Sequence, residues 1–406
     1  MEVDIRALGT FRSLAHEGAE HAAGSLSQLT GIETTVDVTN VTLTSHADLA
    51  REFGDDEFVG VQIGFSGRLT GETVLAFDRD SVSTIVDVLV PGASTEGSFD
   101  EMARSGVEEV GNIMMGGFID GWADYLEASI DMSPPTYVER TGSEILPDST
   151  FTGETDDHVF VFKSQMRAVD ETLNFHIYML PEAEVLSELL SMRSRGADTV
   201  VPIDKLSVFN EMTREGTKKA ADNVTTLTGI DTDVEVSRLS FVPIEDVPNS
   251  IGDDEYVGVV TEFDGLPSGY LAFLFDEDSA HTIVESMLPT EPSAEWGEME
   301  QSAIVELGNI MTSGFIDGWA NVLATTIDHE PPQFVHDMGS AIMSPVVGRL
   351  GKQQRYAFLI DSTVQTAGDE FNCDIYAVPD ESELREVLES PIDERVDQME
   401  PDTELF

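Results

Sequence analysis

Cysteine and long apolar runs are what this chain most clearly lacks. Cys373 is its single cysteine, which excludes an internal disulfide and a zinc site made of several thiolates. No apolar run reaches the roughly 20 residues that a membrane-spanning helix needs. The opening residues, MEVDIRALGT, lack the basic region and the apolar stretch of a secretory signal. We therefore expect a soluble protein that stays in the cytoplasm.

Basic residues are also scarce. Only 21 of the 406 residues are Lys or Arg, against 78 Asp and Glu, so the formal net charge is −57. Without a basic patch to contact phosphates, a nucleic-acid partner is not expected. The acids spread along the whole chain, which favours a solvated coat over a calcium or magnesium site. Such a coat is typical of a salt-loving cell, because a Debye length of about 3 Å at ~1 M salt removes its self-repulsion.

The motifs of several enzyme classes are missing. The sequence contains no glycine-rich phosphate loop and no Gly-x-Ser-x-Gly elbow. His16, Glu17 and His21 lie in HEGAEH, whose spacing is one residue too long for the metalloprotease helix motif. We therefore predict no cofactor and no metal ion held by the chain itself.

What the chain does contain is an internal repeat. LTGIETTVDV at 29–38 returns as LTGIDTDVEV at 227–236, and GDDEFVGVQIGFSG at 54–67 returns as GDDEYVGVVTEFDG at 252–265. Both pairs lie 198 residues apart. A repeat of this length, recurring at a fixed offset, indicates two homologous units in tandem.

Domain boundaries follow from this repeat. We predict one domain at 1–195 and a second at 203–390. The linker between them, at 196–202, falls in a stretch that mixes charge, Gly and Pro. The closing segment at 391–406 is acidic and interrupted by Pro, so we expect a mobile tail there.

Each unit is itself double. In the first, a helical segment at about 5–28 leads into an alternating strand, two further strands joined by a turn, and a helix. The same order starts again with a helix at about 99–127. Because the links between strands are short, antiparallel pairing is favoured. The predicted fold class is α+β, with two helix–three strands–helix halves per domain that share an antiparallel sheet around a pseudo-twofold axis.

The longest repeated passage holds the candidate functional residues. EEVGNIMMGGFIDGWADYLEASIDMSPPTYV at 108–138 returns as VELGNIMTSGFIDGWANVLATTIDHEPPQFV at 305–335. At helical spacing Ser105, Glu109 and Asn112 share one polar stripe, and apolar residues occupy the opposite side. The second copy repeats the stripe with Ser302, Glu306 and Asn309.

Two interpretations of this stripe compete. It could be the solvated side of an ordinary amphipathic helix. Asn, however, is a mediocre helix former, yet both copies keep it, and small residues follow one turn later at Gly116 and Ser313. An Asn amide donates one hydrogen bond and accepts another, so it can hold a water molecule at a fixed angle. A neighbouring Glu suits a Lys on a partner, which favours a surface that inserts a water-positioning amide into another protein's phosphoryl site.

The spacing also resembles a known family signature. The pattern Asp/Ser-x3-Glu-x2-Asn-x22-Pro is similar to that of the CheC/CheX/FliY phosphatases of chemotaxis, whose members have internally pseudo-symmetric domains. Within 105–135 it is completed by Ser105, Glu109, Asn112 and Pro135. Within 302–332 it is completed by Ser302, Glu306, Asn309 and Pro332. By this resemblance the chain would be two CheC-like domains in tandem.

The resemblance implies a substrate and roles for the motif residues. The substrate would be the phosphorylated response regulator CheY (CheY-P), whose aspartyl phosphate is hydrolysed with the regulator's own Mg²⁺ in place. Asn112 and Asn309 would orient the attacking water, and Glu109 and Glu306 would hold the regulator's Lys. The Ser and Pro positions of both motifs would have supporting roles.

A second function of a different class stays open. The chain could be a non-catalytic binding module that docks CheY, a CheD-type deamidase or the archaeal flagellar motor. Replacing both Asn residues by Ala would then leave its biological effect intact.

The first and third quarters of the chain depart from the signature. In the first quarter Ser13 and His16 stand where Glu and Asn are expected, and Thr39 stands at the Pro position. In the third quarter Arg214 replaces the Asn, although a guanidinium cannot accept a hydrogen bond from water. The other motif positions there hold Ser207, Glu211 and Ser237. We therefore predict one working site in each domain.

Overall fold

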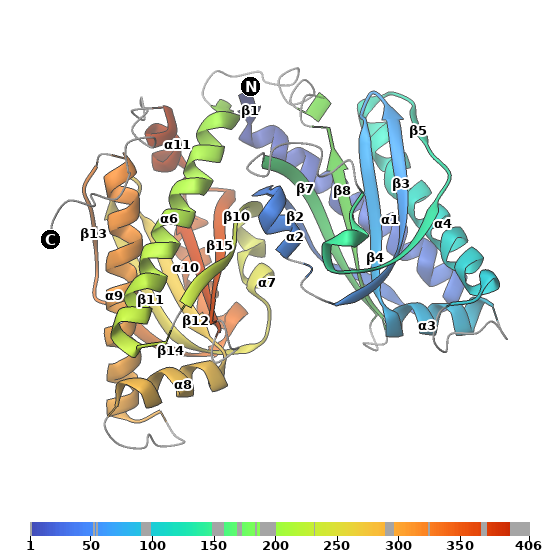
Figure 1. Cartoon of the computed structure of the whole chain (residues 1–406). Coiled ribbons are helices and arrows are strands. Elements are labelled where there is room, and N and C mark those ends of the chain that lie inside the picture. The colour runs from blue at the N-terminus through green and yellow to red at the C-terminus, as the bar shows by residue number, and fades with distance from the viewer. Residues whose placement is uncertain are drawn as a thin grey trace, which may run out of the picture. The chain divides into compact units, whose positions relative to one another are not determined.

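The fold consists of two compact units that divide between Val200 and Val201 (Figure 1). The computed structural model describes residues 2–51, 53, 56–90, 99–147, 158–168, 173–182, 185–186, 200–230, 232–288, 296–323, 325–366 and 372–389. The predicted tail and most of the predicted linker lie outside these residues. The last three linker positions form strand β9 (Val200–Pro202).

The first unit has the predicted order of elements as far as β8, with four short additions, and the helix predicted to close its second half lies mostly outside the described residues. Its elements are β1 (Glu2–Asp4), α1 (Ile5–Thr30), β2 (Thr34–Ser45), α2 (His46–Arg51), β3 (Glu57–Gly67), β4 (Gly71–Asp78), α3 (Arg79–Leu89), α4 (Glu101–Leu126), β5 (Ile130–Met132), β6 (Thr136–Thr141), the 3-10 helix η1 (Gly142–Ile145), β7 (His158–Ala168) and β8 (Asn174–Pro181). The additions β1, α2, β5 and η1 are too short to give a periodic signal in the sequence.

The second unit repeats this order. Its elements are α6 (Ile203–Thr228), β10 (Thr232–Pro243), the 3-10 helix η4 (Ile244–Asp246), α7 (Val247–Ile251), β11 (Glu255–Gly265), β12 (Gly269–Phe275), α8 (Glu277–Met287), α9 (Glu298–Leu323), β13 (Ile327–His329), β14 (Gln333–Met338), α10 (Gly339–Leu350), β15 (Tyr356–Thr366), β16 (Asn372–Pro379) and α11 (Glu381–Glu389). Helix α10 was not predicted.

Strand order confirms the predicted internal symmetry of each unit. In the first unit the order is β6–β3–β4–β8–β7–β2, with every neighbouring pair antiparallel. The two halves meet where β4 pairs with β8. The first strand of each half pairs with a strand of the other half, β2 with β7 and β6 with β3. The second unit has the matching order β14–β11–β12–β16–β15–β10.

Two long helices cover one face of each sheet. In the first unit α1 packs against α4, and in the second α6 packs against α9 (Figure 1). Trp122 of α4 is fully buried, stacks on Phe11 of α1 at 5.5 Å between ring centroids, and meets Phe162 of β7 edge-on. This aromatic contact joins both helices to the sheet and fixes which side of α4 faces inward.

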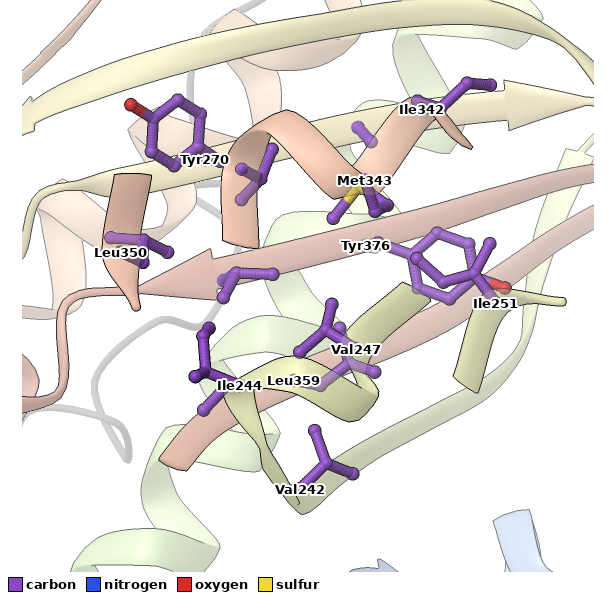
Figure 2. Packing of buried hydrophobic residues seen from close by; sticks show 14 of the residues in the cluster. Val242, Ile244, Val247, Ile251, Tyr270, Ile342, Met343, Leu350, Leu359 and Tyr376 are labelled. Atoms are coloured by element: carbon purple, nitrogen blue, oxygen red, sulfur yellow. The ribbon is translucent and has the colours of Figure 1, made fainter. Parts of the chain in front are cut away.

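The opposite face of the second sheet has its own core. Alternate residues of β12 and β16, including Tyr270 and Tyr376, point into a hydrophobic cluster that η4, α7 and α10 cover (Figure 2). Ile342, Met343 and Val346 of α10 are buried in it, which explains why this insertion is helical. Within the described residues, no helix combines the length and the hydropathy that crossing a membrane requires.

Candidate functional site

Helix α4 presents the first motif copy. Its first turn is capped by Asp100, whose side chain accepts hydrogen bonds from the backbone N–H groups of Met102 (3.1 Å) and Ala103 (2.8 Å). Its last turn ends at Glu127 in the left-handed conformation. The inward face is formed by residues that are at most 2% exposed: Val107, Val110, Met114 and Phe118. Helix α9 has the same length and presents the second copy.

The predicted polar stripe faces outward. Ser105, Glu109 and Asn112 are exposed. In the second copy Ser302 and Glu306 are exposed, and Asn309 is half-buried. Within the described part of the chain, no hydrogen bond or ion pair reaches the side chains of Glu109, Asn112, Glu306 or Asn309. Both carboxylates and both amides are therefore available to a group from outside the protein.

A close helix–sheet contact holds the stripe in this orientation. Gly111 directly precedes Asn112, and a Cβ atom at Gly111 would lie 2.8 Å from the side chain of Val61 on β3. Gly308 precedes Asn309 and meets Val259 on β11 in the same way. Only glycine allows the helix axis to come this near to the strand. This role of the glycine was not predicted from the sequence, although both copies contain the Gly-Asn pair.

The segment after each helix is tied to the same strand. The turn before Pro135 is pinned to β3, because the Ser133 N–H donates to the Gly64 carbonyl at 2.8 Å and the Ser133 hydroxyl accepts from the Gly64 N–H at 2.9 Å. Strand β6 starts immediately after Pro135, and β14 starts immediately after the buried Pro332. Each proline thus directly precedes a strand, where its restricted φ and its missing N–H donor are tolerated.

Strand β6 also contacts the helix next to the stripe. The backbone N–H of Tyr137 donates to Oε1 of Glu108 at 3.2 Å. Glu108 precedes Glu109 in the chain, so this bond fixes the turn of α4 from which Glu109 extends.

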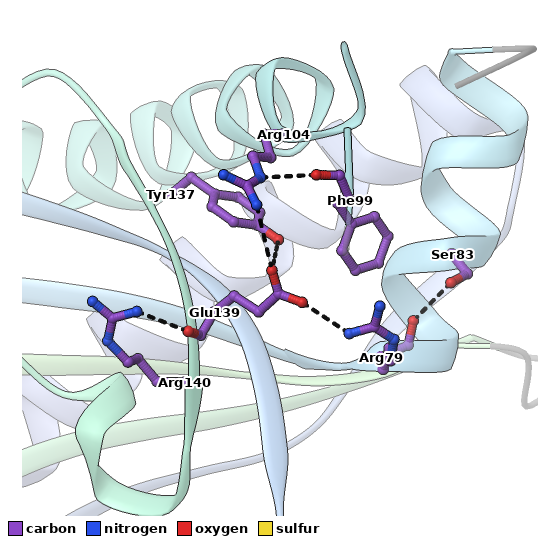
Figure 3. A network of polar contacts seen from close by, with 7 residues as sticks. All are labelled: Arg79, Ser83, Phe99, Arg104, Tyr137, Glu139 and Arg140. Atoms are coloured by element: carbon purple, nitrogen blue, oxygen red, sulfur yellow. Dashed lines mark hydrogen bonds and ion pairs between the residues drawn. The ribbon is translucent and has the colours of Figure 1, made fainter. Parts of the chain in front are cut away.

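A polar network flanks the first copy (Figure 3). Arg79 forms an ion pair with Glu139 at 2.8 Å, and the Tyr137 hydroxyl donates to the other oxygen of Glu139 at 3.3 Å. Arg104 donates from Nε to the Phe99 carbonyl at 2.9 Å, and its guanidinium lies over the Tyr137 ring. Burial, followed by the charge of Glu139, raises the pKa of Tyr137, so its hydroxyl remains a donor. None of these contacts was predicted from the sequence.

The second copy differs one turn beyond its Asn. The Ser313 hydroxyl donates to the Asn309 carbonyl at 2.9 Å and lies 3.2 Å from Nε2 of His329. The first copy has Gly116 and Met132 at these places. Small residues beside the amide were predicted in both copies, but the histidine contact was not.

The departures in the first and third quarters occupy equivalent helix–strand positions. The structure brings His16 and Thr39 together, with Nδ1 of His16 lying 3.2 Å from the Thr39 hydroxyl. Ser13 is exposed and its hydroxyl donates to its own helix at the Gly9 carbonyl. Arg214 is half-buried. The side chains of Ser207, Glu211 and Ser237 lie outside the described part. That the motif-equivalent sites in the first and third quarters are inactive stays a prediction.

Comparison with known proteins assigns the family. The profile described as the CheC-like family matches residues 299–336, and the profile described as chemotaxis phosphatase CheX matches residues 59–156. Each match contains one complete motif. CheC1 of Halobacterium salinarum, whose name places it among CheY-P phosphatases, is 36% identical over 184 residues, which are 45% of this chain and 93% of CheC1.

Two further relatives are more distant. The CheY-P phosphatase CheC of Bacillus subtilis is 23% identical over 186 residues, which are 44% of this chain and 89% of CheC. The crystal structure of Thermotoga maritima FliY has a TM-score of 0.37 at 24% identity and covers 46% of this chain and 94% of its own. Because one relative exceeds 30% identity over nearly its whole length, the chain belongs to the CheC/CheX/FliY family of chemotaxis phosphatases. The halophilic source of CheC1 agrees with the acidic coat.

The helix–sheet contact leads to a stability prediction. Gly111→Ala should lower the free energy of unfolding by about 1–3 kcal/mol, because the added methyl group overlaps Val61. Gly24→Ala in α1 is the matched control. No atom lies within 4 Å of its added Cβ, so it should raise stability by about 0.5–1 kcal/mol. Urea unfolding in molar salt, followed by circular dichroism, measures both. Equal shifts of the same sign would contradict the contact.

Proposed function

We propose that each unit hydrolyses the aspartyl phosphate of a CheY-type response regulator. One observation supports this most strongly. The motif pair of Glu and Asn occurs twice, on helices of equal length, and both copies direct it outward with no partner among the described residues. A site that keeps its polar groups unpaired at the surface is suited to complete another protein's reaction centre.

The chemistry requires little from the amide beyond geometry. A water oxygen attacks phosphorus in line with the scissile bond, the bond between phosphorus and the Asp carboxylate oxygen breaks, and inorganic phosphate leaves. The proton of the water passes to the phosphate. Asn112 or Asn309 would accept a hydrogen bond from that water and fix its approach, since an amide does not titrate near neutral pH. The regulator would supply the Mg²⁺ that neutralises the developing charge.

Glu109 and Glu306 would bind the regulator. Each is an exposed carboxylate one helical turn before its Asn, and a Lys ammonium on the regulator would form a charge-assisted pair with it. This pair would set the depth at which the amide enters the phosphoryl site. Ser105, Ser302, Pro135 and Pro332 would support the two sites from their edges.

One site would operate in each unit. The equivalent positions in the first and third quarters hold His16 and Arg214 in place of an amide. Arg214 cannot accept a hydrogen bond from water. His16 is engaged with Thr39, within its own unit.

Replacing the two Asn residues tests the proposal. In molar salt, the chain should accelerate phosphate loss from a phosphorylated CheY-type receiver. Asn112→Ala together with Asn309→Ala should return the rate to the receiver's own hydrolysis, because no amide then orients the water. Each single variant should keep roughly half of the acceleration, since one site remains.

Asn321→Ala provides the matched control. Asn321 is another exposed Asn of α9, and it lies off the stripe, so its loss should leave the rate unchanged. Full activity in the double variant would refute the catalytic role of the amides. Binding without acceleration by the unmodified chain would identify a docking module instead. Complete inactivity after one single change would refute the two independent sites.

A further inference from the structure

The two motif copies share their geometry but differ in the residues beside it. Helices α4 and α9 are equally long, as are strands β6 and β14, so their positions correspond one to one. The fourth residue of the helix is Arg104 in the first copy and Gln301 in the second. The fourth residue of the strand is Glu139 in the first copy and His336 in the second.

Gln301 shows that the structural task at this position needs no charge. Its Nε2 donates to the Trp296 carbonyl at 2.7 Å. Arg104 makes the corresponding bond, from Nε to the Phe99 carbonyl at 2.9 Å. Both side chains thus hold the segment before the long helix, and a neutral amide does so as well as a guanidinium. The charge of Arg104 therefore calls for another explanation.

The guanidinium of Arg104 is held in place, but its two terminal nitrogens keep their capacity to donate hydrogen bonds (Figure 3). It lies 5.3 Å from the centre of the Tyr137 ring, and its Nη2 forms a long ion pair with Glu139 at 3.9 Å, which is beyond hydrogen-bond distance. Glu139 is already paired with Arg79 at 2.8 Å. Neither terminal nitrogen of Arg104 is hydrogen-bonded to any residue that the structure describes. The side chain is 47% exposed, so its outer edge can reach a ligand.

The position of Arg104 defines what that ligand can be. Arg104 precedes Asn112 by eight residues, or about 12 Å along the helix at 1.5 Å per residue. That is too far to touch a phosphoryl group whose attacking water Asn112 holds. A fixed guanidinium fork at this distance matches a carboxylate on the rim of the docked protein. In a chain with 21 cations and 78 acids, such a fixed cation is also unusual.

We propose that Arg104 is a specificity-determining contact, which binds an Asp or Glu carboxylate on the rim of the regulator docked at the first copy. The second copy, with neutral Gln301, does not select for this carboxylate. The two sites of one chain therefore rank regulators differently. This inference rests on the proposed function, because it takes a receiver domain as the docked partner.

Molar salt separates this contact from general attraction. Charges farther apart than about 3 Å are screened at ~1 M salt, whereas a hydrogen-bonded ion pair at contact distance is screened much less. The contribution of Arg104 should therefore persist in the salt that removes long-range steering.

The test is a binding measurement on the full chain. The second motif is disabled by Glu306→Ala and Asn309→Ala, so that one docking site remains. The probe is a CheY-type receiver that carries beryllofluoride in place of its phosphoryl group. Arg104→Gln should weaken binding by about three- to tenfold in ~1 M KCl. Folding should be unaffected, since Gln301 already performs the anchoring task in the second unit.

Arg140→Gln is the matched charge control. Arg140 is exposed on the same strand as Glu139, and its Nη1 donates only to the Glu139 backbone carbonyl at 3.0 Å, on the side of the strand opposite the Glu139 carboxylate (Figure 3). Its change should therefore alter affinity less than twofold. A rim carboxylate on the receiver should be found by replacing its Asp and Glu residues singly with Ala. Replacing the carboxylate that contacts Arg104 should weaken binding to the unmodified first copy, but should not weaken it further when Arg104 is already Gln.

The second copy allows the reciprocal change. With the first motif disabled by Glu109→Ala and Asn112→Ala, Gln301→Arg should strengthen binding of the same receiver. An affinity that Arg104→Gln leaves within twofold would overturn the inference. If dephosphorylation by the unmodified chain persists in that case, the proposed function survives alone. If the unmodified chain binds no receiver, both fail.

Discussion

The contact between Gly111 and Val61, repeated between Gly308 and Val259, is the constraint on which the rest of the structure depends. It presses the middle of each long helix onto a strand of its sheet at the residue before the Asn. With the apolar side of the helix fixed inward by this contact and by the Trp122 packing, the Glu and Asn side chains have no direction left except outward. A site that works inside another protein needs such rigidity, because its own side chains must not rearrange on docking.

Much of this arrangement could be predicted from the sequence, because duplication doubles each periodic signal. The order of the described long helices and strands and the outward stripe of Ser105, Glu109 and Asn112 follow from local periodicity, and the antiparallel sheet follows from the short links between strands. What escaped prediction depends on long-range packing. Helix α10 is stabilised by the sheet face beneath it, and the approach at Gly111 depends on Val61, fifty residues earlier. Neither partner is visible in a local window of sequence.

The two copies keep the same residues at the centre of the motif but differ in the residues around it. The Glu and Asn residues are identical in both copies, whereas the flanks diverge from Arg104, Glu139 and Met132 to Gln301, His336 and His329. Divergence of this kind leaves the reaction unchanged and alters the surface that a partner meets. In a chain whose coat is uniformly acidic, a fixed cation beside one copy is a large local difference.

The central claim is that the outward amides enter the reaction centre of a docked receiver. A crystal structure of the full chain with a beryllofluoride-loaded receiver, grown in molar salt, tests it most directly. The account predicts that the Asn112 amide lies within about 2.7–3.2 Å of a water aligned with the beryllofluoride, and that Glu109 pairs with a receiver Lys. A receiver bound elsewhere, with both stripes still facing solvent, would contradict it.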